Sequence, residues 1–121
     1  SVGILVDKEF KNTDRVFITI FDAADAFLID YAQKLISNAG SQVTVLDADG
    51  SIKNNPQIKE TIRSIEHTAP NHITLLNERK LEKDFLQEQD LMIISVESWK
   101  KLVESRSTWL NNTPSLLIIK Q

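Results

Sequence analysis

Beyond Arg15, apolar runs typical of β-strands alternate with stretches of helical spacing, and this alternation restricts the fold more than any other feature. The expected strands are Val16–Phe21, Val43–Leu46, Ile73–Leu76, Leu91–Ile94 and Leu116–Ile119. Repeated strand–helix alternation predicts a parallel sheet with helices on both faces. Because crossovers between parallel strands are right-handed, the default strand order is 3-2-1-4-5. We therefore expect an α/β domain over residues 15–121.

Helices are expected between these strands. They run from Asp22 or Asp25 to Asn38, from Pro56 to His67, from Leu81 to Gln89 and, with a break, from Glu97 to Trp109. Gly40 should end the first helix, because glycine accepts the left-handed conformation that closes a helix. Pro56 suits the first turn of the second helix.

Residues 1–14 look like a separate unit. Ser1–Asp7 is a buried-type apolar run, and a charged spacer follows it up to Asp14. The run resembles Ser115–Lys120, as if both were end strands of two repeats. In the expected order the last strand lies at an edge of the sheet, and we expect Val2–Val6 to pair antiparallel with it. We interpret the chain as a domain cut from a longer protein, with residues 1–14 the terminal strand and linker of a preceding repeat.

Composition excludes several classes of protein. The 121 residues are 41% apolar and 26% charged, which is ordinary for one globular domain. A net charge of −3 without a basic stripe argues against nucleic-acid binding. The absence of cysteine excludes disulfides, thiol catalysis and cysteine-bound zinc. The apolar runs are far shorter than the roughly 20 residues of a membrane-spanning helix, so we expect this piece to be soluble.

A group of mostly polar residues follows the expected strands at the edge where open parallel sheets bind ligands. They are Asp22, Ala23 with Ala24, Asp25, Asp47, Asp49, Asn77, Ser95 and Glu97. Carboxylates gathered there could bind Mg²⁺. Asp and Ser are also common at such positions because they cap helices and begin the turns that follow strands. This interpretation is favoured over a metal site. We expect no metal and no cofactor; any ligand should lie near Asp22, Ala23, Asp25, Asp47 and Ser95.

Two enzyme-like patterns compete with that reading. The segment Val43–Ser51 resembles the nucleophile motif of haloacid-dehalogenase phosphatases, with Asp47 as nucleophile and Asp49 as general acid. Ser95 would then stand for the second motif of that family. The motif lies on the second strand instead of the first, and no late acidic pair follows Ser98. Coincidence is therefore the better explanation.

A response-regulator receiver has the same architecture. Asp22, Ser95 and Lys120 occupy suitable positions for an acidic pocket, a switch residue and the lysine of such a domain. The phospho-acceptor position is Asn77, however, and an amide cannot accept the phosphoryl group as an aspartate does. This excludes a functioning receiver but leaves a degenerate one open.

The histidines and tryptophans favour simpler roles. His67 and His72 flank a turn without a third ligand at useful spacing, so we expect solvated turn residues. Trp99 and Trp109 are ten apart on a broken helix, which favours packing in a core or an interface.

Several stretches together resemble the C-terminal cytosolic region of bacterial monovalent cation/proton antiporters of the cation:proton antiporter-2 family. That region is similar to a tandem of universal-stress-protein-like domains. Ser1–Asp7 reproduces the strand that ends the first half, with Lys8 in place of an arginine. In the second half, Val16–Phe21 is similar to the opening strand, Tyr31-Ala32 to a helix dipeptide and Asp90–Ile94 to a late strand. Asp25 matches one of two paired aspartates.

The departures from the family pattern bear on function. Asp22-Ala23 replaces a Gly-Gly pair, and Ser95-Val96 replaces Gly-Arg. ATP-binding universal stress proteins carry a glycine-rich loop after the fourth strand, where backbone N–H groups approach phosphate. The three glycines of this chain are Gly3, Gly40 and Gly50, and none follows that strand. ATP bound in the usual way is not expected.

The resemblance implies a non-catalytic regulatory domain on the cytoplasmic side of the inner membrane. Its partners would be the transporter domain of the same polypeptide and a preceding repeat or a second copy of the domain. Ion exchange would occur in the membrane domain. The alternatives are a free-standing nucleotide-binding stress protein and, less favoured, a phosphatase or a degenerate receiver.

Overall fold

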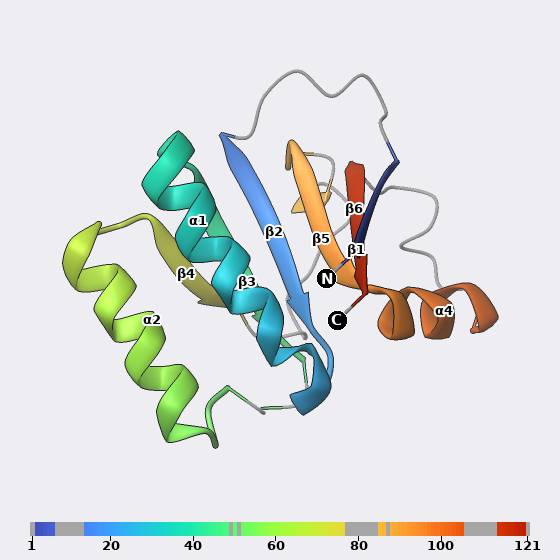
Figure 1. Cartoon of the computed structure of the whole chain (residues 1–121), viewed down its shortest axis with the longest axis horizontal. Coiled ribbons are helices and arrows are strands. Elements are labelled where there is room, and N and C mark those ends of the chain that lie inside the picture. Colours follow the sequence, from blue (N-terminus) through green and yellow to red (C-terminus); the bar gives the residue numbers. More distant parts are fainter. Residues whose placement is uncertain are drawn as a thin grey trace.

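The computed structural model describes residues 2–6, 14–48, 50, 52–76, 85–86, 88–105 and 114–120 (Figure 1). Its strands are β1 (Val2–Val6), β2 (Arg15–Ile20), β3 (Gln42–Asp47), β4 (Ile73–Leu76), β5 (Leu91–Ser95) and β6 (Ser115–Lys120). Its helices are η1 (Ala23–Leu28, a 3₁₀-helix), α1 (Ile29–Ala39), α2 (Pro56–Thr68) and α4 (Val96–Glu104).

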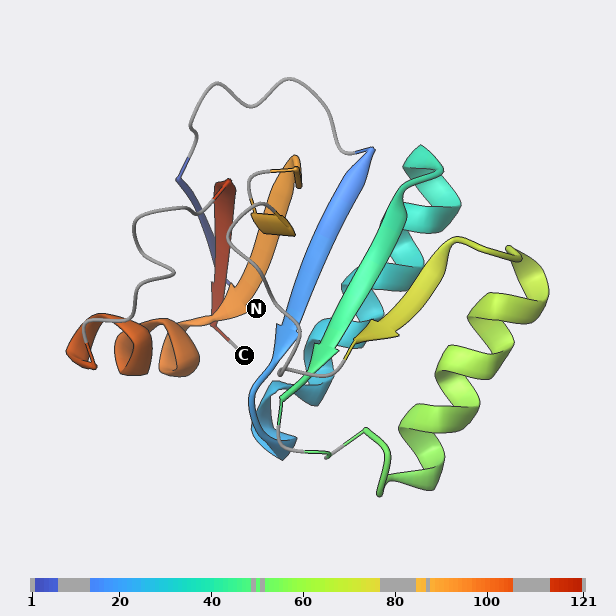
Figure 2. The same ribbon diagram turned by 180° about the vertical axis from the view of Figure 1, so that it is seen from behind.

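The strands form one sheet in the order β1-β6-β5-β2-β3-β4. Strands β2 to β6 are all parallel to their neighbours. Numbered from β2, they run 3-2-1-4-5, which confirms the order expected from the sequence. At the far edge β1 pairs antiparallel with β6, with Val2 opposite Lys120 and Val6 opposite Leu116. In Figures 1 and 2, β1 accordingly lies beside β6 at this edge of the sheet.

Two apolar clusters lie on opposite faces of the sheet because side chains alternate along each strand. On one face, Val16, Ile18 and Ile20 of β2 pack with residues of α1 and with Ile65 of α2. These two helices cover that face in Figure 1.

The second cluster joins Phe17 to Met92, Ile94, Leu116 and Ile118, and Trp99 of α4 packs against it. Phe17 and Phe85 meet edge to face, with ring centroids 5.1 Å apart. Helices therefore cover both faces, as the sequence predicts.

The ends of α1 and α2 follow local chemistry. Gly40 closes α1 in the left-handed conformation, with φ 65°, and its N–H donates to the Ile36 carbonyl. Asn55 caps α2, because its side-chain oxygen accepts the N–H groups of Gln57 and Ile58 and Pro56 occupies the first turn. Both boundaries confirm the sequence prediction.

The first predicted helix differs from the structure at its start. A single helix was expected from Asp22 or Asp25, but the chain forms η1 and only then α1. Asp22 is the cap of η1, where its carboxylate accepts the N–H of Ala24 at 2.9 Å. The expected helix at 81–89 and the second half of the one at 97–109 lie largely outside the described residues.

Candidate functional site

The two strands at the centre of the site, β2 and β5, separate before they end. Their pairing covers three positions and stops at Ile18 opposite Ile93. By contrast, β2 continues to pair with β3 as far as Asp47, and β5 with β6 as far as Ser95. Thr19 spans the widening gap, because its buried hydroxyl donates to the Ile93 carbonyl at 3.0 Å.

This gap is the topological switch point of the sheet. The chain leaves β2 toward the face that carries α1, and it leaves β5 toward the face that carries α4. A crevice outside the carboxyl ends of two such strands is where open α/β sheets bind their ligands. The candidate residues Asp22, Ala23, Asp25 and Ser95 all come from the two segments that flank it.

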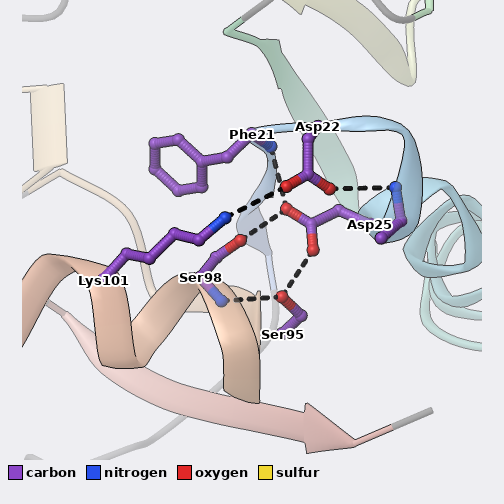
Figure 3. Close-up of polar contacts among 7 residues, drawn as sticks. Phe21, Asp22, Asp25, Ser95, Ser98 and Lys101 are labelled. Carbon is purple, nitrogen blue, oxygen red and sulfur yellow. Dashed lines mark hydrogen bonds and ion pairs between the residues drawn. The ribbon is translucent and has the colours of Figure 1, made fainter.

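The carboxylate of Asp25 occupies this crevice (Figure 3). Its side chain is 2% exposed. One oxygen, Oδ1, accepts the Ser95 hydroxyl at 2.5 Å; the other, Oδ2, accepts the Ser98 hydroxyl at 2.6 Å and the N–H of Phe21 at 2.9 Å. Asp25 therefore joins the segment after β2 to the end of β5 and the start of α4 through two hydrogen bonds, and the third lies within its own segment. We call Asp25, Ser95 and Ser98 the Asp25 clasp.

Ser95 also begins α4. Its Oγ accepts the N–H of Ser98 at 3.2 Å, which satisfies one of the free donors of the first helical turn. The same oxygen therefore accepts from the backbone and donates to Asp25. The clasp places a carboxylate at the amino end of α4, where the helix dipole favours negative charge.

Asp22 lies at the rim of the clasp. Besides capping η1, it forms an ion pair with Lys101, whose Nζ lies 3.4 Å from Oδ2. Both side chains are largely exposed, so this pair is screened by solvent and contributes little. Ala23 is exposed and has no polar side chain.

Asp47 has a different role. Its two carboxylate oxygens accept the N–H groups of Ile52 and Lys53, each at 3.1 Å. These bonds close the turn after β3, in agreement with the capping role favoured from the sequence. Both oxygens that a phosphatase nucleophile would use therefore already accept backbone donors. Asp49 and Asn77 lie outside the described residues.

The cavity beside the clasp is small. It has a volume of about 150 Å³, and its walls include Asp25, Ser95, Phe27, Ile119 and Lys120. Pockets that enclose a drug-sized ligand usually measure about 300–1,000 Å³. A nucleotide would not fit without movement of the surrounding segments.

Over the described ranges, no three His, Asp or Glu side chains gather closely enough to hold a metal ion. His67 is exposed. The ring of His72 lies 3.2 Å from the Ser41 carbonyl through Nδ1. Trp99 packs against the second apolar cluster, in agreement with the expected packing role, whereas Trp109 is outside the described residues.

Sequence reasoning missed Ser98, Thr19 and Lys101. The sequence contained a signal for Ser98. It lies three residues after the helix cap Ser95, so both side chains lie on the same face of the helix. Its exposure of 2% within an otherwise accessible helix is what distinguishes it. Thr19 gave no signal, because threonine is common in strands and its bond depends on how far β2 and β5 separate.

No protein-family model matches this chain, and no curated protein or solved structure is significantly similar to it. Among the helices that the structure describes, none combines the length and the apolar character needed to cross a membrane.

Proposed function

We propose that this chain is a non-catalytic regulatory domain of universal-stress-protein type. We place it on the cytoplasmic side of a bacterial monovalent cation/proton antiporter of the cation:proton antiporter-2 family. In this proposal residues 15–121 form the domain, and β1 is the end strand of a preceding repeat. The membrane domain of the same polypeptide exchanges Na⁺ or K⁺ for protons, and this domain changes how readily it does so.

The observation that carries the non-catalytic part is the Asp25 clasp. The crevice at the switch point is filled by a side chain of the protein itself, and the oxygens of Asp25 already accept three hydrogen bonds. A catalytic carboxylate or hydroxyl must instead reach a substrate atom. The remaining cavity of about 150 Å³ is too small for a nucleotide.

Two further features support the proposal. The sheet order 3-2-1-4-5 with helices on both faces is the architecture that the resemblance implies. The edge beside β6 is occupied by β1, as expected if a strand of a preceding repeat protects an edge that would otherwise be open to pairing.

Regulation of a transporter requires a domain that binds differently to two of its states. We infer that the contacts are made with the membrane domain, the preceding repeat or a second copy of this domain.

The first test is the reading frame upstream of Ser1, which should encode a series of membrane-spanning segments and another α/β repeat. The encoded protein, placed in inverted membrane vesicles, should dissipate a pH gradient when Na⁺ or K⁺ is added. Deleting residues 15–121 should leave exchange possible but change its rate at a given pH. A frame without membrane-spanning segments, or a deletion without effect on the rate, would contradict the proposal.

Nucleotide binding is tested on the chain itself. We expect ATP, ADP and adenosine at millimolar concentration to leave the midpoint of thermal unfolding unchanged. A ligand present at 100 times its Kd would stabilise the native state by about 2.7 kcal/mol and raise the midpoint by several degrees. Such a rise would favour the free-standing nucleotide-binding protein instead.

A further inference from the structure

The segment that carries Asp25 has an unusual conformation. η1 is a 3₁₀-helix of six residues that leads directly into α1. Runs of 3₁₀-helix longer than three or four residues are uncommon because their hydrogen bonds are poorly aligned, although short 3₁₀ turns are frequent where an α-helix begins. The conformation of η1 therefore needs support from outside the helix.

For the first residues of η1 that support comes from the Asp22 cap and from the buried side chain of Asp25. Within residues 23–27, Asp25 is the only buried residue, since Ala23 and Ala24 are exposed and Ala26 and Phe27 are half-buried. Immediately beyond, Leu28 and Ile29 are 0% and 3% exposed and belong to the first apolar cluster. The start of η1 is thus held by polar contacts, and its end is anchored in the core.

The contacts of Asp25 can be exchanged for water at limited cost. Its three partners are two hydroxyls and one backbone N–H, all of which water also satisfies. The adjoining cavity of about 150 Å³ reaches both Asp25 and Ser95 and has room for water molecules. Release of the clasp would therefore expose polar atoms, together with the apolar ring of Phe27, which is half-buried against the first apolar cluster.

The sheet adds little resistance at this position. Backbone pairing between β2 and β5 has ended at Ile18 and Ile93. Beyond this point the hydrogen bonds between the two segments include those of Thr19 and the Asp25 clasp, with the exposed pair of Asp22 and Lys101 at the rim.

We propose that Asp25 is a latch and that η1 pivots about Leu28 and Ile29. In the closed state described here, Asp25 binds Ser95 and Ser98 and fills the switch-point crevice. In the open state η1 moves away, the clasp is hydrated and the crevice becomes accessible. This inference rests on the proposed regulatory function only for its biological role. A regulatory domain requires a second state, and the open state of the latch supplies it.

Native-state hydrogen exchange of the 121-residue chain tests the latch. The amides of Phe21 and Ser98 donate to clasp oxygens, whereas those of Ile18, Val45 and Ile93 belong to fully buried residues of the central strands. We expect Phe21 and Ser98 to exchange through a shared local opening that depends weakly on denaturant, and the central strands to exchange through global unfolding. If Phe21 and Ser98 in the wild type exchange only with the central strands, the latch does not exist.

Two variants sharpen this test. Asp25→Ala and Ser98→Ala should each increase local opening at Phe21 by roughly tenfold or more, the effect of losing a hydrogen bond to a charged group. The matched control is Asp30→Ala, which removes an exposed carboxylate of α1 outside the clasp and should leave exchange at Ser98 unchanged. An equal acceleration at every amide in both clasp variants would show a general loss of stability and overturn the proposal.

Tryptophan fluorescence gives an independent readout. Trp109→Phe leaves Trp99, adjacent to Ser98 in α4, as the single tryptophan. Adding Asp25→Ala should increase acrylamide quenching of Trp99 while the far-ultraviolet circular dichroism remains native. Unchanged quenching would contradict an opening between η1 and α4 and count against the latch.

Failure of the latch and failure of the regulatory function are distinguishable. The exchange and fluorescence experiments use the chain alone and do not depend on a transporter. If they show the latch but Asp25→Ala in the parent protein leaves ion exchange unaltered, the latch stands and the regulatory role does not.

Discussion

The Ser98 hydroxyl donates to the Asp25 carboxylate over 2.6 Å, although 73 positions separate the two residues in the chain. This bond connects the first turn of α4 to the segment after β2, across the gap where backbone pairing has stopped (Figure 3). A side chain thus performs a function that backbone hydrogen bonds perform elsewhere in the sheet.

Asp25→Ala should lower the free energy of unfolding by about 2–4 kcal/mol, because a buried acceptor of three hydrogen bonds is lost and its donors are left unpaired. Urea denaturation followed by circular dichroism measures the change. Asp22→Ala serves as control and should cost only about 1 kcal/mol, the usual loss for a helix cap. Equal losses in the two variants would contradict the central role of Asp25.

A double-mutant cycle should separate the clasp from its rim. We expect Asp25→Ala and Ser98→Ala to couple by about 1 kcal/mol or more, since the two side chains are in direct contact and buried. The pair Asp22→Ala and Lys101→Ala should couple by less than about 0.5 kcal/mol, because its side chains are exposed and screened by solvent. Each cycle requires the free energies of unfolding of the wild type, the two single variants and the double variant. A larger coupling energy for Asp22 and Lys101 than for Asp25 and Ser98 would refute the prediction.

Thr19→Val removes the hydroxyl that binds the Ile93 carbonyl while keeping the shape of the side chain. It should lower stability by about 1–2 kcal/mol, the cost of leaving a buried polar group unpaired. Thr74→Val, at an exposed position of β4, is the matched control and should change stability by about 0.5 kcal/mol or less. Thermal unfolding of both variants decides the matter; similar midpoints would mean that the Thr19 bond contributes nothing.

Asp47→Ala should lower stability by about 1–2 kcal/mol, because the N–H groups of Ile52 and Lys53 lose their acceptor. Asp47→Asn retains one acceptor oxygen and should cost less. We expect neither the wild-type chain nor Asp47→Asn to hydrolyse p-nitrophenyl phosphate in the presence of Mg²⁺. Magnesium-dependent turnover in the wild type that Asp47→Asn abolishes would restore the phosphatase interpretation.

The parallel sheet could be predicted because strong local patterns point to one topology. Leu91–Ile94 has no polar alternation and is buried on both faces, as expected for an inner strand. Gly40 and Pro56 mark helix ends through backbone chemistry that depends on adjacent residues only. Right-handed crossovers then leave few strand orders.

The candidate site could be predicted in place but not in arrangement. Asp22, Asp25 and Ser95 follow the two strands at the switch point, which predicts that they lie near one another. The structure brings Asp25 and Ser95 into contact. Whether the Asp25 side chain faces solvent or Ser98 depends on the pitch of η1. The sequence does not reveal this pitch, because over one turn a 3₁₀-helix and an α-helix show the same pattern. Asp47 belongs to the same predicted group because it also follows a strand, yet its bonds lead to its own turn.

The pairing of β1 with β6 has a mechanical consequence. Val2 lies opposite Lys120, so a force that pulled the two chain ends apart would act on one end of this antiparallel pair. Its hydrogen bonds run perpendicular to the strands and would break one after another, starting at Val2. The strand would peel off under a small load while the parallel sheet, which is loaded only through β6, stayed intact.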